Sequence, residues 1–257
     1  MNIELKVTDA VAGHNMKIGA GFSARHFGED SFDGLVDPVL MLDHFRMTAP
    51  TFGAHRHAGI SAVTYVFEDS IGSHMNHDSL GNRGPIRPGH LHWMVAGRGA
   101  VHDEQPEGKD VEVHGLQIFV NLPAAKKSMQ PYAVQVDAAH MPEFQSPGVR
   151  VRVVVGVSNG LTSAATPPQP FTLLDGFLSA QAEFRHTLEP GWDAMVYVVS
   201  GRLHLGIGDA RRVIESGHAV GIGLFKSAVA AELHFTTGDD EASHFVLLCG
   251  PALREPP

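Results

Sequence analysis

The sequence has a single cysteine and no long apolar run, and both scarcities restrict what the protein can be. Cys249 has no second thiol to pair with, so the chain forms no internal disulfide. It lies in the apolar stretch 245–249, which predicts a buried structural thiol. Nowhere do 18 apolar residues follow one another, and residues 1–17 lack a basic segment leading into an apolar one. We therefore expect a soluble, cytoplasmic protein without a membrane span.

Positive charge is also scarce. Against 28 acidic residues stand 19 Lys and Arg, which gives a formal net charge of −9, and no basic run concentrates positive charge. Direct binding to nucleic-acid phosphates is therefore not expected. Several catalytic motifs are missing as well. Residues 19–24 lack the third glycine of a dinucleotide-binding loop, and neither a serine protease triad nor a phosphate-cradling loop stands out.

Glycine and proline, in contrast, are abundant. The 28 Gly and 16 Pro, with only 18% charged residues, suit many short strands joined by tight turns. Apolar and polar residues alternate in segments such as 151–155 and 202–205, which is the pattern of half-buried strands. At 257 residues the chain exceeds the usual domain size of about 100 to 150 residues. We predict an all-β fold in two domains.

A weak internal repeat relates the two halves. Residues 63–67 (VTYVF) resemble residues 195–199 (MVYVV), and each copy leads through a similar turn into a further apolar strand. Two related barrels in tandem would explain the repeat. We expect an N-terminal unit of residues 1–132 and a C-terminal unit of residues 133–257, with the segment up to about Arg25 adding strands that brace the barrels.

Histidine is the compositional anomaly, because 12 of the 17 histidines lie at or before His140. A β-strand sends residues i and i+2 to the same face, so His55 and His57 can share one ion. The same spacing places His102 and Glu104 side by side. If the two segments lie on neighbouring strands of a small barrel, four ligands converge on one interior point.

Three imidazoles and one carboxylate are a donor set that suits borderline divalent ions. We predict one divalent transition-metal ion bound by His55, His57, His102 and Glu104. Fe(II) is the first choice, and Mn, Co, Ni, Cu or Zn fit the same donors. The alternative is a set of hydrogen-bonded polar side chains near a barrel mouth.

The other histidines receive more ordinary interpretations. His90 and His92 form a second HxH pattern, which we interpret as surface or supporting residues because such triplets arise by chance in a histidine-rich chain. His74 and His77 flank a turn and are predicted to be solvated. Two ungapped matches of the repeat, one at Tyr197 on Tyr65 and one at Gly217 on Gly89, set four residues of the second half against the four predicted ligands: Thr187, Glu189, Ala230 and Glu232. The second barrel is therefore predicted to lack the ligand set.

Residues 21 to about 132 resemble the pirin family, a branch of the two-barrel cupins. Five ordered segments carry the likeness: GFSARHF, DPVLMLDHF, HRHAGISAVTYVFE, HDSLGNRGPIRPGHLHWMVAGRGAVHDEQP and GLQIFVNLP. From residue 133 onward the resemblance is looser. It implies two tandem cupin (double-stranded β-helix, jelly-roll) barrels. It also implies that the first barrel holds a single iron or other divalent ion, at positions that map onto His55, His57, His102 and Glu104.

The resemblance implies a function as well. Pirin-like proteins are associated with flavonol 2,3-dioxygenase (quercetinase) activity and, in some members, with binding of regulatory protein partners. We expect a metal-dependent dioxygenase that acts on a flavonol-like or other enolisable aromatic substrate, with Glu104 as the candidate base. The alternative is a non-catalytic, metal- or redox-responsive protein that binds a protein partner.

The chain departs from the family pattern in three places. Ser61 stands where the family usually has a glutamate, so we expect a different pocket polarity, although metal binding should survive because the carboxylate comes from Glu104. Asn76 replaces a histidine often found before the DSLGN segment, with His77 displaced by one position. Longer family members also continue past the position of residues 255–256.

Overall fold

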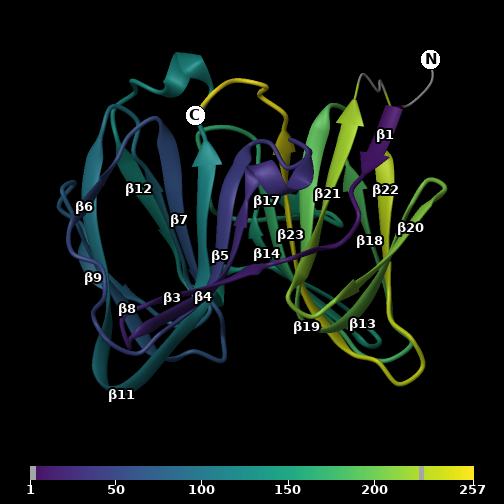
Figure 1. The fold of residues 1–257 in the computed structure, drawn as a ribbon, viewed down its shortest axis with the longest axis horizontal. Helices are drawn as coiled ribbons and strands as arrows, with labels where there is room; N and C mark the ends of the chain where they lie inside the picture. The colour runs from purple at the N-terminus through teal and green to yellow at the C-terminus, as the bar shows by residue number, and fades with distance from the viewer. Residues whose placement is uncertain (1–3, 226–228) are drawn as a thin grey trace.

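Strands dominate the computed structural model, which describes residues 4–225 and 229–257. Figure 1 shows two β-barrels side by side, the first mostly purple to teal and the second mostly green to yellow. Within the described ranges the helical elements are three short 3-10 turns: η1 (Glu29–Phe32), η2 (Ala124–Lys126) and η3 (Ala138–His140). The prediction of an all-β fold is confirmed.

The first barrel is built around a 10-stranded sheet. Its strands are β3 (His14–Ile18), β4 (Phe22–Gly28), β5 (Val39–Met47), β6 (His55–His57), β7 (Ile60–Val66), β8 (Ile71–Asp78), β9 (Arg83–Ile86), β10 (Leu91–Val95), β11 (Ala100–Asn121) and β12 (Tyr132–Val136). The long strand β11 pairs with β6 and β8 in its first half and with β5 and β7 in its second half, so it joins the two layers of the barrel.

The second barrel is built around an 11-stranded sheet, and a two-stranded ribbon of β15 and β16 lies beside it. Its strands are β1 (Glu4–Val7), β2 (Val11–Ala12), β13 (Glu143–Ser146), β14 (Val149–Val155), β17 (Thr172–Leu178), β18 (Glu183–Leu188), β19 (Trp192–Ile207), β20 (Ala210–Glu215), β21 (His218–Phe225), β22 (Ala231–Thr236) and β23 (Ser243–Pro251). The ribbon comprises β15 (Val157–Ser158) and β16 (Leu161–Thr162).

The two sheets share one strand order. The path β12-β10-β7-β11-β5-β4-β3 in the first barrel corresponds position by position to β1-β21-β19-β23-β17-β14-β13 in the second. Strands β7 and β19 carry the two copies of the sequence repeat, and they occupy the same position in this order. The weak repeat therefore reflects a shared barrel topology.

Strand pairing crosses the predicted boundary between residues 132 and 133. Strands β1 and β2, at the N-terminal end, pair with β21 of the second barrel. Strand β12, which extends from residue 132 to 136, pairs instead with β10 of the first barrel. Since β3 and β4 continue into the first sheet, the N-terminal segment contributes strands to both barrels. The division at residue 132 stays a prediction about folding units, and these edge strands are exchanged across it.

A hydrophobic core runs from one barrel into the other. Trp93 of β10 packs edge-on against Phe171, with 5.3 Å between the ring centroids, and one cluster of buried residues contains side chains from both barrels. A second cluster fills the second barrel and includes Cys249. Burial raises the pKa of the Cys249 thiol to about 12, so the cysteine is buried and un-ionised, as the sequence predicted.

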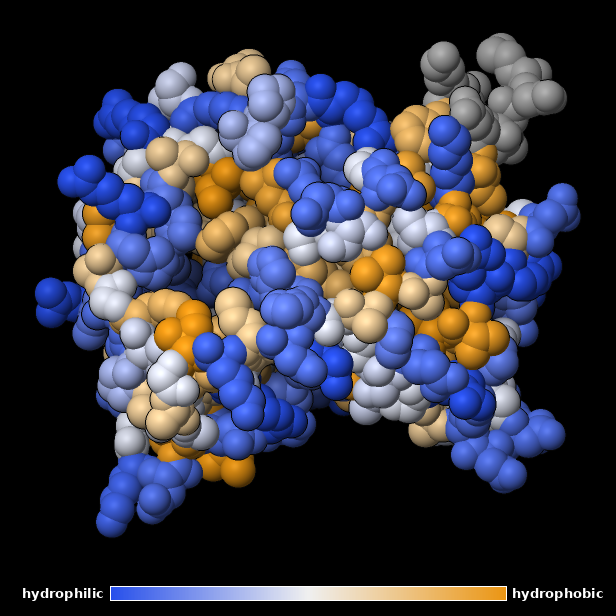
Figure 2. Space-filling view, viewed as in Figure 1, coloured by the Kyte–Doolittle hydropathy of each residue, from blue (hydrophilic) through white to orange (hydrophobic). Residues whose placement is uncertain are grey.

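The visible surface of the molecule is mixed. In Figure 2, hydrophilic residues dominate the rim of both barrels, and hydrophobic residues show between them nearer the middle. Among the described residues there is no helix of the length and apolar character needed to cross a bilayer.

Candidate metal centre

Strands β6 and β11 lie side by side and bring three histidines together. The antiparallel register pairs His55 with His102 and places His57 two residues along the same face of β6. The Nε2 atom of His102 lies 3.2 Å from Nε2 of His55 and 3.1 Å from Nε2 of His57. Among the described residues, this is the group of three whose donor atoms all lie within 4.8 Å of one another. The two sequence segments with i, i+2 spacing thus meet through the register of β6 and β11.

The three imidazoles span the edge of the barrel. His102 is buried, His57 is half-buried and His55 is exposed, so the cluster connects the interior with solvent. Burial lowers the pKa of His57 to about 4, and the neighbouring His102 and His55 add to this effect. A neutral imidazole is the form that binds a metal. At neutral pH His57 is therefore ready to act as a ligand without losing a proton first.

Glu104 lies on the far side of the His102 ring from the point where the three Nε2 atoms meet. Its Oε1 atom is 3.5 Å from Nδ1 of His102, and its Oε2 atom accepts a hydrogen bond of 2.7 Å from the Thr64 hydroxyl. Burial raises the pKa of this carboxyl, but the imidazoles of His102 and His74 outweigh it, so the pKa lies below its usual value. In this arrangement Glu104 supports the outer nitrogen of a candidate ligand, a common companion of metal-bound histidine.

His74 was predicted to be a solvated loop residue, and this was wrong. It belongs to strand β8, is only 4% exposed, and its Nδ1 atom lies 3.8 Å from Oε2 of Glu104. His77 is exposed, as predicted, because it lies three residues further along the strand on the other face. The stretch around these two histidines resembles a turn in sequence but forms a strand. The alternation of side chains along that strand turns His74 inward and His77 outward.

His90 and His92 are buried and are not surface residues, although neither joins the three-histidine cluster. His90 is 8% exposed and lies 3.1 Å from Asp137. His92 is 2% exposed, and both of its ring nitrogens lack a hydrogen-bond partner. Burial lowers the pKa of His92, and the charges of Glu104 and His102 act on it as well.

A cavity of about 190 Å³ opens beside the cluster. Its polar lining includes His55, His102 and Glu104, together with Asp43 and Gln117. Its apolar lining is rich in aromatic and sulfur-containing side chains: Phe22, Met41, Phe45, Met47, Phe52 and Phe119. Concave, mostly apolar sites with a few convergent polar groups are typical of small-molecule binding. Asp43 and Gln117 carry no local motif, so the sequence alone does not predict their place in the cavity.

The donor set fits a divalent transition metal. The Nε2 atoms of His57 and His55 lie 3.1 and 3.2 Å from Nε2 of His102. A cation at one point between the three nitrogen atoms could be bound by all of them. On the far side of the ring, Nδ1 of His102 and Oε1 of Glu104 are buried without a hydrogen-bond partner and face each other at 3.5 Å, as the outer nitrogen of a metal-bound histidine and its supporting carboxylate do.

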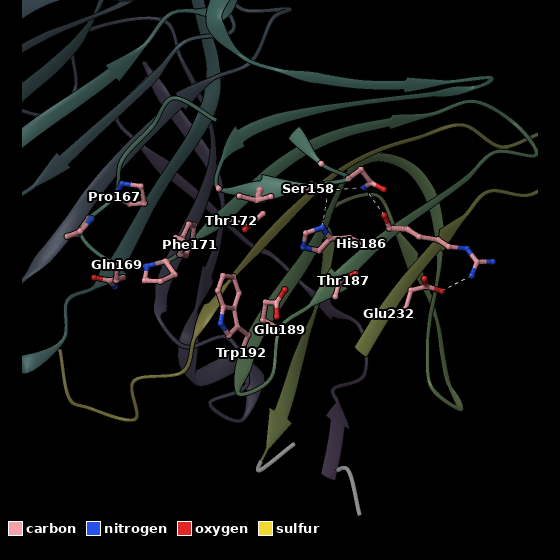
Figure 3. A pocket seen from close by; sticks show the side chains of 17 residues that line it. Ser158, Pro167, Gln169, Phe171, Thr172, His186, Thr187, Glu189, Trp192 and Glu232 are labelled. Carbon is pink, nitrogen blue, oxygen red and sulfur yellow. Dashed lines mark hydrogen bonds and ion pairs between the residues drawn. The ribbon is translucent and has the colours of Figure 1, made fainter. Parts of the chain in front are cut away.

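The second barrel contains a larger cavity of different character. About 790 Å³ of space lies between β18, the start of β19 and the loop after β14, and Figure 3 shows Trp192 and Phe171 on its wall near Pro167. Many of its polar groups are paired with one another. Ser158 contacts Nδ1 of His186 at 3.0 Å, and a dashed line in Figure 3 marks this interaction.

The interior of the second barrel differs from the positions expected from the ungapped repeat. The expected residues Thr187, Glu189 and Glu232 are exposed. The neighbouring residues face inward instead, because the pairing of β18 with β22 turns the alternate residues into the barrel: Phe184, His186, Leu188, Leu233 and Phe235. One histidine among four apolar side chains replaces the three-histidine arrangement of the first barrel.

Comparisons with known proteins agree with this fold. The Pirin family model matches residues 12–120. Pirin of Homo sapiens is 33% identical over 258 residues, covering 100% of this chain and 86% of that protein. The solved structure of GK1651 from Geobacillus kaustophilus superposes with a TM-score of 0.87 at 26% identity and covers 100% of both chains.

A second solved structure carries an activity in its name. Quercetin 2,3-dioxygenase from Acinetobacter baumannii superposes with a TM-score of 0.81 at 26% identity, covering 98% of this chain and 88% of that one. The strand order and these superpositions agree in giving two tandem cupin barrels. With 33% identity to a pirin along its full length, this chain belongs to the pirin family.

Proposed function

We propose that this protein is a metal-dependent dioxygenase of the quercetinase type, acting on a flavonol-like or other enolisable aromatic substrate. The observation that carries the proposal is the meeting of three Nε2 atoms, 3.1 and 3.2 Å apart, at a cavity with aromatic walls. A three-histidine metal site alone suits many roles. A cluster that opens into an apolar cavity suits a reaction on a bound aromatic ring.

His55, His57 and His102 are the proposed ligands through their Nε2 atoms, with Fe(II) as the first choice of ion, and Glu104 would become the fourth ligand only by leaving its position beside Nδ1 of His102. When bound, such an ion supplies Lewis acidity toward a substrate oxygen and redox chemistry toward dioxygen. Thr64 holds the Glu104 carboxylate through a hydrogen bond of 2.7 Å, and Glu104 in turn faces the outer nitrogen of His102. These contacts fix the orientation of the His102 ring toward the cavity.

The cavity walls would bind the substrate and displace water from around it. Phe119 packs against His57 with 5.0 Å between ring centroids, and Phe22 packs against Phe52 at 4.9 Å, so aromatic faces border the cluster. An aromatic substrate gains from contact with such faces, and the expulsion of water strengthens electrostatic interactions within the site. Glu104 is the proposed base for a substrate hydroxyl near the histidines, and it is ionised at neutral pH because its neighbours hold its pKa below the usual value.

An aerobic assay tests the proposal. Protein loaded in turn with Fe(II), Mn(II), Co(II), Ni(II) and Cu(II) is mixed with quercetin, and the loss of flavonol absorbance and the release of carbon monoxide are followed. We expect turnover with at least one ion and none with His102→Ala. Absence of turnover with every ion, in protein shown to contain stoichiometric metal, contradicts the proposal.

A second function is favoured by the exposure of His55. Because this candidate ligand lies at the surface beside the exposed Arg56, the charge and redox state of a bound ion would change the affinity of this surface for a protein partner. In this alternative, the protein is a metal-responsive module. Pull-downs with the Fe(II), Fe(III) and metal-free forms test it, and identical recovery from all three forms contradicts it.

A further inference from the structure

A row of polar side chains crosses the first sheet through the wall of the cavity. His26 of β4 pairs with Asp43 of β5, Asp43 pairs with Gln117 of β11, and Gln117 pairs with Thr64 of β7. Residues that are paired across neighbouring strands point to the same face of a sheet. Two members of the row, Asp43 and Gln117, line the cavity beside the three-histidine cluster.

The rows on either side of this polar row are apolar. Two residues before Asp43 along β5 lies Met41, which pairs with Phe119, and two residues after it lies Phe45. Met41, Phe45 and Phe119 all line the same cavity. A carboxylate in such surroundings costs free energy unless it is paired or put to use. Asp43 is 7% exposed, so this cost applies to it.

Asp43 is satisfied on one side only. Its Oδ1 atom lies 2.6 Å from Nδ1 of His26, whose side chain is 37% exposed. Gln117, its neighbour on the other side, is already engaged, because its amide donates to the Val63 carbonyl and its Oε1 lies 3.1 Å from the Thr64 hydroxyl. Among the described residues, the second carboxylate oxygen of Asp43 has no hydrogen-bond partner.

The other carboxylate of the cavity is less available. Both oxygens of Glu104 face protein groups, one the Thr64 hydroxyl at 2.7 Å and the other Nδ1 of His102 at 3.5 Å. A ligand hydroxyl in this cavity would therefore find a free carboxylate oxygen on Asp43 more readily than on Glu104. The exposed imidazole of His26 orients that carboxylate from behind, as a carboxylate and imidazole pair does at many acid–base sites.

We propose that Asp43 is a second acid–base group of this cavity, which binds a hydroxyl of a polyhydroxylated aromatic ligand and accepts its proton, with His26 as the positioning residue. The O–H bond of the ligand breaks, its electron pair stays on the ligand oxygen, and the proton passes to the free oxygen of Asp43. The proton passes from Asp43 to water when the ligand leaves the cavity. The inference rests on the proposed dioxygenase function for the aromatic nature of the ligand.

The electrostatics of the row agree with this role. Burial raises the pKa of Asp43, and the hydrogen bond and charge of His26 partly offset the rise. A base works best when its pKa approaches the working pH, so the rise favours proton acceptance. The groups that face Asp43 are His26 from β4 and Gln117 from β11, and the titratable groups elsewhere on the cavity wall are His55, His74, His102 and Glu104.

Binding of two flavonols to zinc-loaded protein tests the inference. Quercetin and 3-hydroxyflavone share the 3-hydroxy-4-keto group that approaches a metal, but only quercetin carries further hydroxyls. Zinc is inert to redox change, so neither compound is consumed. Dissociation constants are measured for the wild type, Asp43→Asn and His26→Gln, with Asp33→Asn as a control because Asp33 is exposed and lies outside the cavity.

We expect the wild type and the control to bind quercetin at least about tenfold more tightly than 3-hydroxyflavone, as for a hydrogen bond to a charged group. Asp43→Asn should reduce that ratio at least about fivefold. In the wild type the ratio should fall as the pH falls through the raised pKa of Asp43. In His26→Gln this fall should occur at higher pH, because the imidazole charge that lowers the pKa of Asp43 is gone.

Two results would overturn the inference, and they differ in what they leave standing. If both flavonols bind and Asp43→Asn keeps the full preference for quercetin, Asp43 has no such role, while the proposed dioxygenase function stands. If neither flavonol binds the wild type, the flavonol-like substrate class fails, and the role of Asp43 fails with it. Circular dichroism and zinc content confirm that each variant is folded and loaded.

Discussion

The Tyr65 hydroxyl of the first barrel donates a hydrogen bond to the Asp175 carboxylate of the second, with 2.7 Å between the two oxygen atoms. Both residues are 0% exposed. Arg152 donates to the same Tyr65 oxygen at 2.7 Å, and His244 approaches the other oxygen of Asp175 at 2.6 Å. The barrels therefore meet through a buried polar network as well as through apolar contacts, and within that network Nε of Arg152 lacks a hydrogen-bond partner.

Removal of the Tyr65 hydroxyl should destabilise the protein. Tyr65→Phe leaves a buried carboxylate with one donor fewer, which costs about 1 to 3 kcal/mol. Urea unfolding measures the change in the free energy of unfolding. Tyr132→Phe is the matched control, because Tyr132 is half-buried and no hydrogen bond of its hydroxyl is recorded in the described chain. Equal stability of the two variants would show that the network contributes nothing.

Metal binding should depend on the three histidines. His102→Ala removes the buried member of the cluster, and bound metal should fall well below one ion per chain after dialysis. Glu104→Gln keeps the shape of the side chain but weakens its contact with His102, so metal affinity should fall about 10- to 100-fold. His77→Ala, at an exposed position on β8, should bind metal like the wild type. Elemental analysis of untagged protein provides the measurement, and full occupancy in His102→Ala contradicts the site.

Stability should fall on mild acidification. Burial lowers the pKa of His44 to about 3, and the nearby His114 adds to the effect, so the folded protein holds this imidazole neutral. The unfolded chain binds a proton near pH 6.5, the ordinary value. The contribution of His44 is therefore complete above that pH and is lost as the pH falls toward about 3.

The variant His44→Gln isolates this contribution. Its free energy of unfolding should fall less steeply between pH 7 and pH 4 than that of the wild type, since one depressed histidine pKa is gone. His14→Gln, at an exposed position, should follow the wild-type slope. Denaturant unfolding at half-unit pH steps gives the slopes. Parallel slopes for all three proteins would mean that His44 is not held neutral by the fold.

Two hydroxyls on strand β7 should behave differently. Ser61 is 0% exposed and its hydroxyl has no hydrogen-bond partner, so Ser61→Ala should leave stability unchanged or slightly higher. Thr64→Val has nearly the same shape as the wild type but removes a donor to Glu104, and it should cost about 1 to 3 kcal/mol. Thermal unfolding of metal-free protein compares them, and a larger loss for Ser61→Ala would reverse the interpretation.

The local spacing of residues predicts which side chains share a strand face, whereas the approach of His102 to His55 and His57 depends on the pairing of β6 with β11. His55 and His57 share a strand face by the period of two, and the HxE segment supplies His102 by the same rule. The strand period says nothing about which face of the His102 ring a carboxylate will meet. Glu104 lies beside Nδ1 of His102, because the rotation of its side chain and the hydrogen bond from Thr64 decide its position. The strand period does not contain this information.

The polar row through Asp43 could not be predicted in this way. Its members come from four strands separated along the chain by up to 91 residues, from His26 to Gln117, and only the cross-strand registers bring them into line. The same reason explains the error in the repeat alignment. A shift of one residue in strand register turns Glu232 outward and Leu233 inward, and the sequence repeat was too weak to fix that register.

The exchanged edge strands set the order in which the protein can be completed. Strand β1 leaves the ribosome long before its partner β21, which ends at Phe225. Hydrogen-bonding groups of β1 must therefore wait through most of synthesis before their partners exist, and pairings so distant in sequence form slowly. A nascent chain of this kind exposes an unpaired strand to its neighbours, and dilution or a chaperone should raise the yield of refolded protein.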